Sequence, residues 1–240
     1  MNTEMKTIRL LGAAQLIVFV GGMIGGLMLT SVVGSGSISD ILVNISKNLT
    51  LMRISNLFAM VESLVIVVLG VLFYIVFSKE YKIIALVALG CILAAVITKA
   101  VGKIGTYALI PLSQEFVEAG APASSYFQTL GDFLYYGVDR QGHDIHMLFW
   151  SLGYILWSYL LFRSRYVPRF LSVWGLVACC LLLISTLLIL YDRDFFSSPA
   201  NILIIPYIPY ELFLGIWLLF KGFNSSAINS LSAKTDIKKV

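Results

Sequence analysis

Charged residues are scarce in this sequence: only 12% of its 240 residues are Asp, Glu, Lys or Arg, against about a quarter in an ordinary soluble domain. Hydrophobic residues make up 59%, and the mean hydropathy is +0.90. A water-exposed surface does not tolerate so few charges, so the composition predicts a protein that crosses a membrane several times, with the lipid bilayer as its first partner. The net charge of +4 needs no nucleic acid to explain it, because basic residues gather at the inner face of membrane proteins.

Common catalytic and cofactor motifs are absent as well. The sequence has no G-x-S-x-G, no H-E-x-x-H, no phosphate-binding loop and no glycine-rich dinucleotide turn. Its three cysteines, Cys91, Cys179 and Cys180, lie in apolar stretches without C-x-x-C spacing, which favours a packing role. His143 and His146 have a spacing that could hold a metal on one helical face, but two histidines near a helix start are more often interfacial caps. We therefore predict no cofactor and no metal, and we assign no catalytic residue.

Long apolar runs fill most of the chain. A bilayer core about 30 Å thick needs about 20 apolar residues per helix, and the apolar runs lack the alternation typical of membrane β-strands. The sequence therefore predicts an all-α polytopic membrane bundle of about six transmembrane helices, with short interfacial helices on the outer face. The six predicted spans are Leu10 to Leu29, Ile54 to Phe77, Ile83 to Val101, Met147 to Phe162, Phe170 to Leu190 and Ile202 to Phe220.

Lysine and arginine gather at one set of predicted span ends. Because basic residues mark the cytoplasmic side, we expect a multi-pass protein of the cell membrane with both termini in the cytoplasm. We also expect residues 1–223 to form one transmembrane domain and residues 224–240 to form a flexible, basic cytoplasmic tail. The basic residues of this set are Lys6, Arg9, Lys79, Lys82, Arg163, Arg165, Arg169, Lys221, Lys234, Lys238 and Lys239.

Two segments between the spans are predicted to be helices at the outer face. Ile38 to Met52 has apolar residues in helical phase, as expected of a short helix lying at the membrane surface. The longest outer segment, about Gly102 to Asp144, is broken at Gly120-Ala-Pro122. Ser124 or Ser125 could cap the helix that follows the break, whose aromatic face could cover the bundle as a lid.

Three segments carry a resemblance to a known family. They are S-Q-E-F-V-E-A-G-A-P-A-S-S-Y-F-Q-T-L-G (Ser113 to Gly131), R-S-R-Y-V-P-R-F-L-S-V-W-G (Arg163 to Gly175) and P-Y-E-L-F-L-G-I-W-L-L-F-K-G-F-N (Pro209 to Asn224). Here the chain resembles a bacterial inner-membrane family catalogued as domain of unknown function 4386, and the similarity extends over nearly the whole chain. The resemblance implies a multi-span helical protein of about this length and names no reaction.

Charged residues inside the spans are the candidates for a functional site. A carboxylate in the middle of a span costs several kcal/mol unless it is paired, solvated or protonated, so it usually has a use. From a rise of about 1.5 Å per residue, Glu62 and Glu211 lie at similar depths, and Lys99 lies slightly nearer the outer surface. Pro206 and Pro209 should break the last helix just before Glu211 and free backbone carbonyls. The predicted ligand-binding residues of this outer pocket are Glu62, Lys99, His146, Tyr154, Tyr207, Tyr210 and Glu211.

Three functions are compatible with these residues. The pocket could bind, transport or sense a small molecule or an ion, which is the interpretation we favour. The charges could instead form a buried network that fixes helix register in a structural or accessory membrane protein. A membrane-embedded enzyme acting on a lipid-like substrate is the third alternative. Gly21, Gly22, Gly25 and Gly26 form small-residue faces that could pack within the bundle or join two copies as a homo-oligomer.

Overall fold

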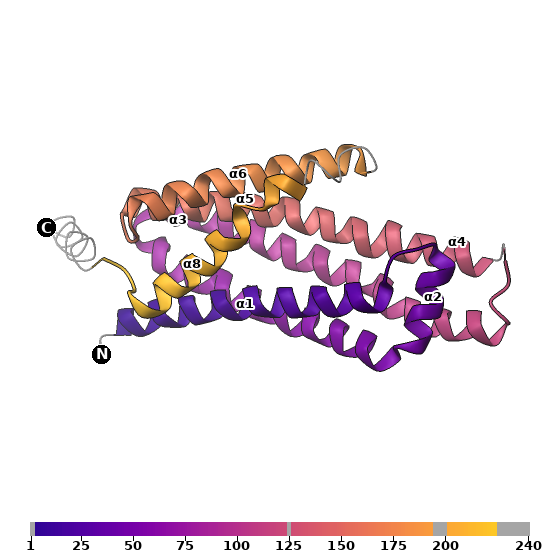
Figure 1. The fold of residues 1–240 in the computed structure, drawn as a ribbon. Coiled ribbons are helices and arrows are strands. Elements are labelled where there is room, and N and C mark those ends of the chain that lie inside the picture. The colour runs from indigo at the N-terminus through magenta and orange to yellow at the C-terminus, as the bar shows by residue number, and fades with distance from the viewer. Residues whose placement is uncertain (1–2, 124–125, 194–200, 225–240) are drawn as a thin grey trace, which may run out of the picture.

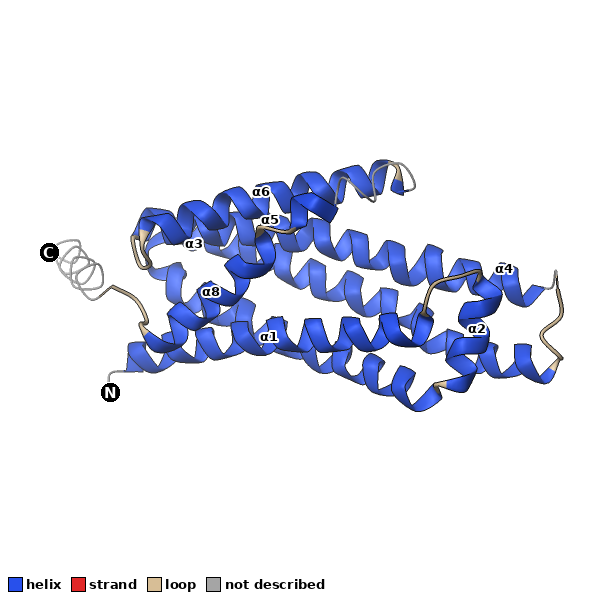
Figure 2. Ribbon diagram, viewed as in Figure 1, coloured by secondary structure: helices blue, strands red, loops and turns tan. Residues whose placement is uncertain are grey.

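The computed structural model describes residues 3–123, 126–193 and 201–224. Helices with short connections make up this described part, which contains no strand (Figures 1 and 2). Five helical stretches are long and apolar enough to cross a membrane: Met5–Val33, Leu49–Glu118, Tyr126–Ser164, Arg169–Tyr191 and Asn201–Phe220. The prediction of an all-α membrane bundle is confirmed.

Helix α3 (Leu49–Glu118) contains two of the predicted spans, because it turns back on itself at Tyr81. Tyr81 is the residue within α3 that has non-helical backbone angles (φ −125°, ψ 44°). A Cβ added to Gly70 would lie 3.1 Å from the side chains of Ile92 and Leu89, so the two halves pack antiparallel around the turn (Figure 1). The five stretches therefore supply six spans, as the sequence predicts.

Helix α1 (Thr3–Val33) is followed by the short helix α2 (Ile38–Lys47). The α2 N-terminus has a capping box, in which the Ser37 side chain accepts from the Asp40 backbone and the Asp40 carboxylate accepts from the Ser37 backbone. Hydrogen bonds from the Ser37 hydroxyl and the Ser37 backbone lower the pKa of Asp40. The apolar face of α2 is buried against the protein and includes Ile41, Leu42 and Ile45. The helix ends at Lys47 and not at Met52 as predicted, and Leu49 to Met52 belong to α3.

The segment after the Gly120-Ala-Pro122 break differs from its prediction. Helix α4 (Tyr126–Asp132) runs into a π-helical segment, η1 (Phe133–Arg140), and then into α5 (Gln141–Ser164) without a break. The expected lid helix is therefore the far end of the fourth span. No proline lies between Pro122 and Pro168, and Gly131, Gly137 and Gly142 do not end the helix. Ser124 and Ser125, the predicted caps, lie outside the described residues.

Helices α6 (Arg169–Tyr191) and α8 (Tyr207–Phe220) complete the bundle. The last span is helical over residues 201–204, turns at Ile205 and Pro206, and resumes as α8. The predicted break is thus confirmed at Pro206, whereas Pro209, where a break was also predicted, lies inside α8. The Pro206 backbone carbonyl accepts a hydrogen bond from Trp174 Nε1 of α6 at 3.1 Å.

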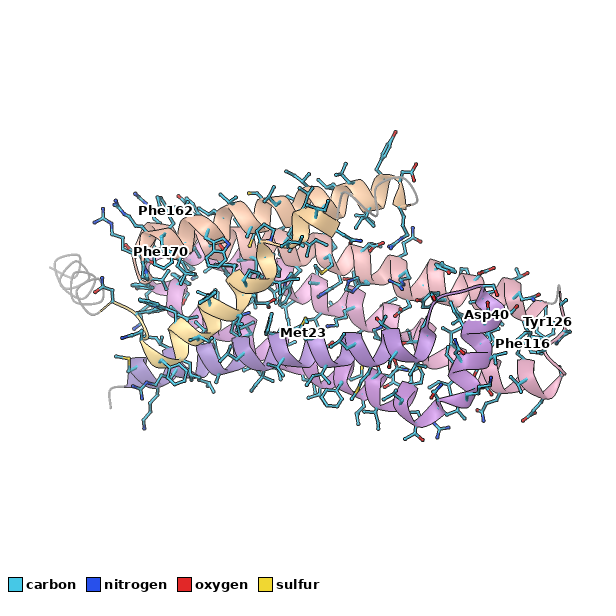
Figure 3. The ribbon with its side chains drawn as sticks, in the orientation of Figure 1. Met23, Asp40, Phe116, Tyr126, Phe162 and Phe170 are labelled. Atoms are coloured by element: carbon cyan, nitrogen blue, oxygen red, sulfur yellow. The ribbon has the colours of Figure 1, made fainter. Side chains whose placement is uncertain are left out.

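The two ends of the bundle differ. The basal end carries the start of α1 and the end of α8, since a Cβ on Gly222 would lie 3.1 Å from the Met5 sulfur. Phe162 and Phe170 mark this end in Figure 3, while Asp40, Phe116 and Tyr126 mark the opposite, distal end. Residues 225–240, most of the predicted cytoplasmic tail, lie outside the described part of the chain.

Two hydrophobic clusters lie one above the other along the bundle. The basal cluster reaches from Ile8 and Phe223 up to Ile66, Trp150 and Tyr207. The distal cluster joins the end of α1 to α2, both halves of α3, α4 and η1. Between the clusters lies a layer in which polar and charged residues are buried, and this layer holds the candidate site.

Candidate functional site

A cavity of about 450 Å³ lies in the polar layer. Its walls come from α1, both halves of α3, η1, α5 and the region around Pro206. Met23, Gly26 and Thr30 of α1 are exposed residues of its rim, and Arg140 and His143 are exposed on the facing side. Met23 is labelled about midway along α1 in Figure 3. The cavity therefore opens between α1 and the η1–α5 helix.

Glu62 and Lys99 meet in this cavity, one from each half of the α3 hairpin. Lys99 Nζ lies 2.7 Å from Glu62 Oε1, and each side chain is 10% exposed. The reversal at Tyr81 places the two residues at the same level, which depth counting had predicted approximately. The geometry of an ion pair compensates part of the cost of burying each charge.

Glu211 lies at the floor of the cavity, on the first turns of α8. Its Oε1 accepts a hydrogen bond from Gln15 Nε2 at 2.9 Å, and its carboxylate also interacts with the Tyr207 hydroxyl. The Gln15 side-chain oxygen in turn accepts from the Tyr154 hydroxyl at 2.9 Å. Gln15 therefore links Glu211 to Tyr154 and fixes the orientation of the carboxylate.

His146 and Trp150 form an aromatic wall beside Glu211. His146 Nδ1 lies 2.8 Å from the Ala95 carbonyl, which can only accept, so Nδ1 carries the proton and Nε2 is an acceptor. The His146 and Trp150 ring centroids are 5.6 Å apart. Trp150 Nε1 donates to the Tyr207 hydroxyl at 2.7 Å, which closes the floor between α5 and α8.

The structure brings five of the seven predicted residues to the cavity wall: Glu62, Lys99, His146, Tyr207 and Glu211. Tyr154 does not line the cavity; it packs on Trp150 and Tyr207 of the cavity wall and is hydrogen-bonded to Gln15. Tyr210 points elsewhere, because its hydroxyl lies 3.0 Å from Ser158 Oγ and its ring packs on Gly175.

The mouth of the cavity has a second set of charges that the sequence interpretation missed. Lys103 Nζ lies 2.6 Å from Asp139 Oδ1. Arg140 donates to the Tyr135 hydroxyl from Nη2 at 2.6 Å and from Nε at 3.2 Å, and its guanidinium stacks 5.1 Å above the Tyr135 ring. Both Asp139 and Arg140 belong to η1, and π-helical segments occur frequently at functional sites.

The glycines of α1 make room for these groups. A Cβ on Gly22 would lie 3.1 Å from Glu62 Oε1, and one on Gly21 would lie 3.7 Å from Glu62 Cγ. Gly25 faces Phe58 and Ser55 of α3, and its carbonyl accepts from Ser55 Oγ at 3.0 Å. Gly26 has open space where its Cβ would be. Gly21, Gly22 and Gly25 thus pack within the bundle, and Gly26 lines the cavity.

His143 and His146 lie close together, with ring centroids 5.9 Å apart. Within residues 3–123, 126–193 and 201–224, no group of three or more His, Cys, Asp or Glu side chains is placed to hold a metal ion. The cavity is therefore a site of paired and unpaired charges and hydrogen-bonding groups.

The fold and the buried polar layer define the class of the protein: a multi-pass α-helical membrane protein. The chain belongs to the family described as Domain of unknown function (DUF4386), whose model matches residues 10–222. This match confirms the resemblance seen in the sequence and includes every residue of the cavity wall. No curated protein and no solved structure matches the chain.

Proposed function

We propose that the protein binds a small charged or polar solute in the cavity between its two hydrophobic clusters, as a membrane carrier or sensor. One observation carries this proposal: the cavity of about 450 Å³ is lined by acidic and basic side chains from several helices. Its volume lies within the range of about 300–1,000 Å³ that is typical of small-molecule sites. Charges inside a membrane bundle usually mark a pathway or a binding site for a solute.

The wall of the cavity supports binding of a solute more directly than it supports a purely structural role. A network that only fixed helix register would be tightly packed, since protein interiors leave few voids larger than a water molecule. Here Glu62, Lys99 and Glu211 face a space large enough for many atoms. Gly26 keeps that space open, because no atom lies within 4 Å of the position of its Cβ.

The test narrows the mouth of the cavity without disturbing the fold. In Gly26→Leu, the new side chain enters open space. Leucine is also a better helix former than glycine, so the helix itself is not weakened. The matched control is Gly90→Leu, because Gly90 also has nothing within 4 Å of its Cβ position but does not line the cavity. Purified wild type and both variants would be screened with amino acids, amines, carboxylates, nucleosides and sugars for ligand-induced thermal stabilisation.

We expect at least one solute class to stabilise the wild type and Gly90→Leu but not Gly26→Leu. A ligand at 100 times its dissociation constant stabilises a folded protein by about 2.7 kcal/mol, which a thermal melt resolves. Equal responses of all three proteins to every solute would refute binding in this cavity.

We also propose that the basal end faces the cytoplasm, so that the cavity opens toward the outside. The ends of the helices support this proposal, since the turn at Tyr81, the α5–α6 turn and both terminal segments share the basal end. Phe77, Tyr166 and Phe223 stack there, and the Asn224 backbone N–H donates to the Tyr166 carbonyl at 3.0 Å. The lysines and arginines that cluster near these segments favour the cytoplasmic side.

A further inference from the structure

The charges that line the cavity are not all paired. Glu62 pairs with Lys99 at 2.7 Å, and Asp139 pairs with Lys103 at 2.6 Å. Among the described residues, these pairs leave one acid and one base on the cavity wall without an oppositely charged partner: Glu211 and Arg140. The partners of Glu211 are the Gln15 amide and the Tyr207 hydroxyl, and the hydrogen-bond partner of Arg140 is the Tyr135 hydroxyl.

The two unpaired charges lie at opposite ends of the cavity. Arg140 is exposed at the mouth, whereas Glu211 is only 8% exposed at the floor. Arg140 precedes Trp150 by ten residues on one continuous helix, and Trp150 is hydrogen-bonded to Tyr207 beside Glu211. At 1.5 Å per residue, these ten residues span about 15 Å along the helix axis. The distance between the two charged groups is shorter than this by the reach of the arginine side chain.

The floor is suited to an organic cation. A buried carboxylate without a counter-charge favours a ligand that carries a positive charge. The aromatic residues Trp150 and Tyr207 line the cavity beside Glu211, and aromatic rings attract an ammonium group most strongly where water is excluded. Within the described residues, the floor does not gather the cluster of carboxylates and imidazoles that a metal ion requires.

The mouth is suited to an acidic group. Arg140 uses Nε and one hydrogen of Nη2 on Tyr135, and its Nη1 donors remain for a ligand. Guanidinium donors bind carboxylates and other oxyanions in a fixed geometry. Apolar side chains such as Val18, Ile66 and Ile204 line the cavity along with the charged groups, and they suit methylene groups.

We propose that the ligand is an elongated zwitterion, whose ammonium group binds Glu211 at the floor and whose acidic group binds Arg140 at the mouth. This inference rests on the proposed solute-binding function and specifies the chemical class of the solute. It also predicts an optimal length, because a short zwitterion reaches only one of the two charges.

The experiment measures binding of simple probes to the purified full-length protein by calorimetry. The zwitterions ω-aminohexanoate, ω-aminooctanoate and ω-aminododecanoate vary the distance between the charges. Octylamine lacks the acidic group, octanoate lacks the ammonium group, and ω-aminooctylphosphonate replaces the carboxylate by a phosphonate. Gly26→Leu measures any partition of the probes into detergent, because its leucine side chain obstructs the mouth of the cavity.

The wild type should bind the zwitterion of best length at least about tenfold more tightly than octylamine or octanoate, since each lost contact with a charge removes 1.4 kcal/mol or more. In Glu211→Gln, the zwitterion should bind no better than octanoate. In Arg140→Gln, it should bind no better than octylamine. The phosphonate arm shows which acidic group the mouth prefers.

Several outcomes separate this inference from the proposed function. Equal affinity of the wild type for octylamine and ω-aminooctanoate, or unchanged binding by Arg140→Gln, would overturn the zwitterion. If a different solute binds and Gly26→Leu abolishes that binding, the proposed function stands and the zwitterion is wrong. If no probe and no screened solute distinguishes the wild type from Gly26→Leu, both are wrong. Arg140 is exposed, so its replacement leaves a folded protein even if Glu211→Gln is unstable.

Discussion

Removing the lysine of the Glu62–Lys99 pair should destabilise the protein far more than removing both partners. The Nζ and Oε1 atoms are 2.7 Å apart, which corresponds to an attraction of about 6 kcal/mol at an effective dielectric constant of about 20. Desolvation of two side chains that are each 10% exposed offsets much of this attraction. Loss of one partner leaves the other buried and unpaired, so we expect Lys99→Met to lower the free energy of unfolding by about 3–5 kcal/mol.

The double variant Glu62→Gln with Lys99→Met should lie within about 1 kcal/mol of the wild type, because no uncompensated charge remains. The measurement is reversible unfolding in dodecylmaltoside micelles with increasing dodecyl sulfate, followed by loss of helical circular dichroism. The four proteins of the cycle give the interaction energy of the pair, which we expect to exceed about 2 kcal/mol. Lys82→Met, at an exposed position of α3, is the control and should change stability by less than about 0.5 kcal/mol. A double variant as unstable as the sum of the two single variants would refute the ion pair as the cause of the Lys99→Met deficit.

Two further measurements test the packing and the orientation. Gly12→Ala should destabilise the protein by at least about 2 kcal/mol in the same unfolding assay, because the new Cβ would lie 2.3 Å from the Leu219 backbone nitrogen. The control is Gly90→Ala, which should be neutral or stabilising because its Cβ enters open space. Equal effects of the two would contradict the close crossing of α1 and α8. A green fluorescent protein fused after Val240 should fluoresce, because the basic basal end holds it in the cytoplasm, and a dark fusion made in normal amounts would place that end outside.

Three charged residues of the cavity wall were predicted from the sequence, because each is conspicuous in an apolar run. Glu62, Lys99 and Glu211 were found in this way. Gln15 interrupts the run L-G-A-A-Q-L-I-V-F-V in the same manner, but a neutral amide does not stand out in a count of charges. It nevertheless forms the hydrogen bond that orients Glu211.

Helical phase explains which tyrosine was misplaced. Tyr207 and Glu211 are four residues apart and share one face of α8, whereas Tyr210 and Glu211 are neighbours separated by about 100° around the axis. Tyr210 therefore cannot face the cavity when Glu211 does. The spacing of Tyr207, Tyr210 and Glu211 by itself therefore indicates which tyrosine shares a face with Glu211.

The charges at the mouth were missed because Asp139 and Arg140 were assigned to the outer segment, about Gly102 to Asp144, and not to a span. They are polar residues outside the apolar run, and hydropathy marks only where a span is apolar, not where its helix ends. The absence of proline from Tyr126 to Ser164 indicated that the helix could continue. Which side of that helix faces the bundle depends on the π-helical register of η1, which no spacing rule gives.

The closest helix contacts were likewise not at the predicted glycines. The α1 pairs at Gly21 to Gly26 pack on side chains or face open space. The tightest backbone approaches join Gly12 to Leu219, Gly105 to Leu134 and Gly142 to Gly102. Gly12, Gly105 and Gly142 have no small residue four positions away on their own helix, so the motif could not mark them.

The α3 hairpin also has a consequence for how the protein enters the membrane. A lysine in the middle of a helix opposes insertion by about 2.5–3.5 kcal/mol when it meets the bilayer alone. Glu62 and Lys99 lie on the two arms of one hairpin and are joined through a single turn at Tyr81. The two arms can leave the translocon together with their charges already neutralised. The third span can thus be inserted before α5, α6 or α8 has been synthesised.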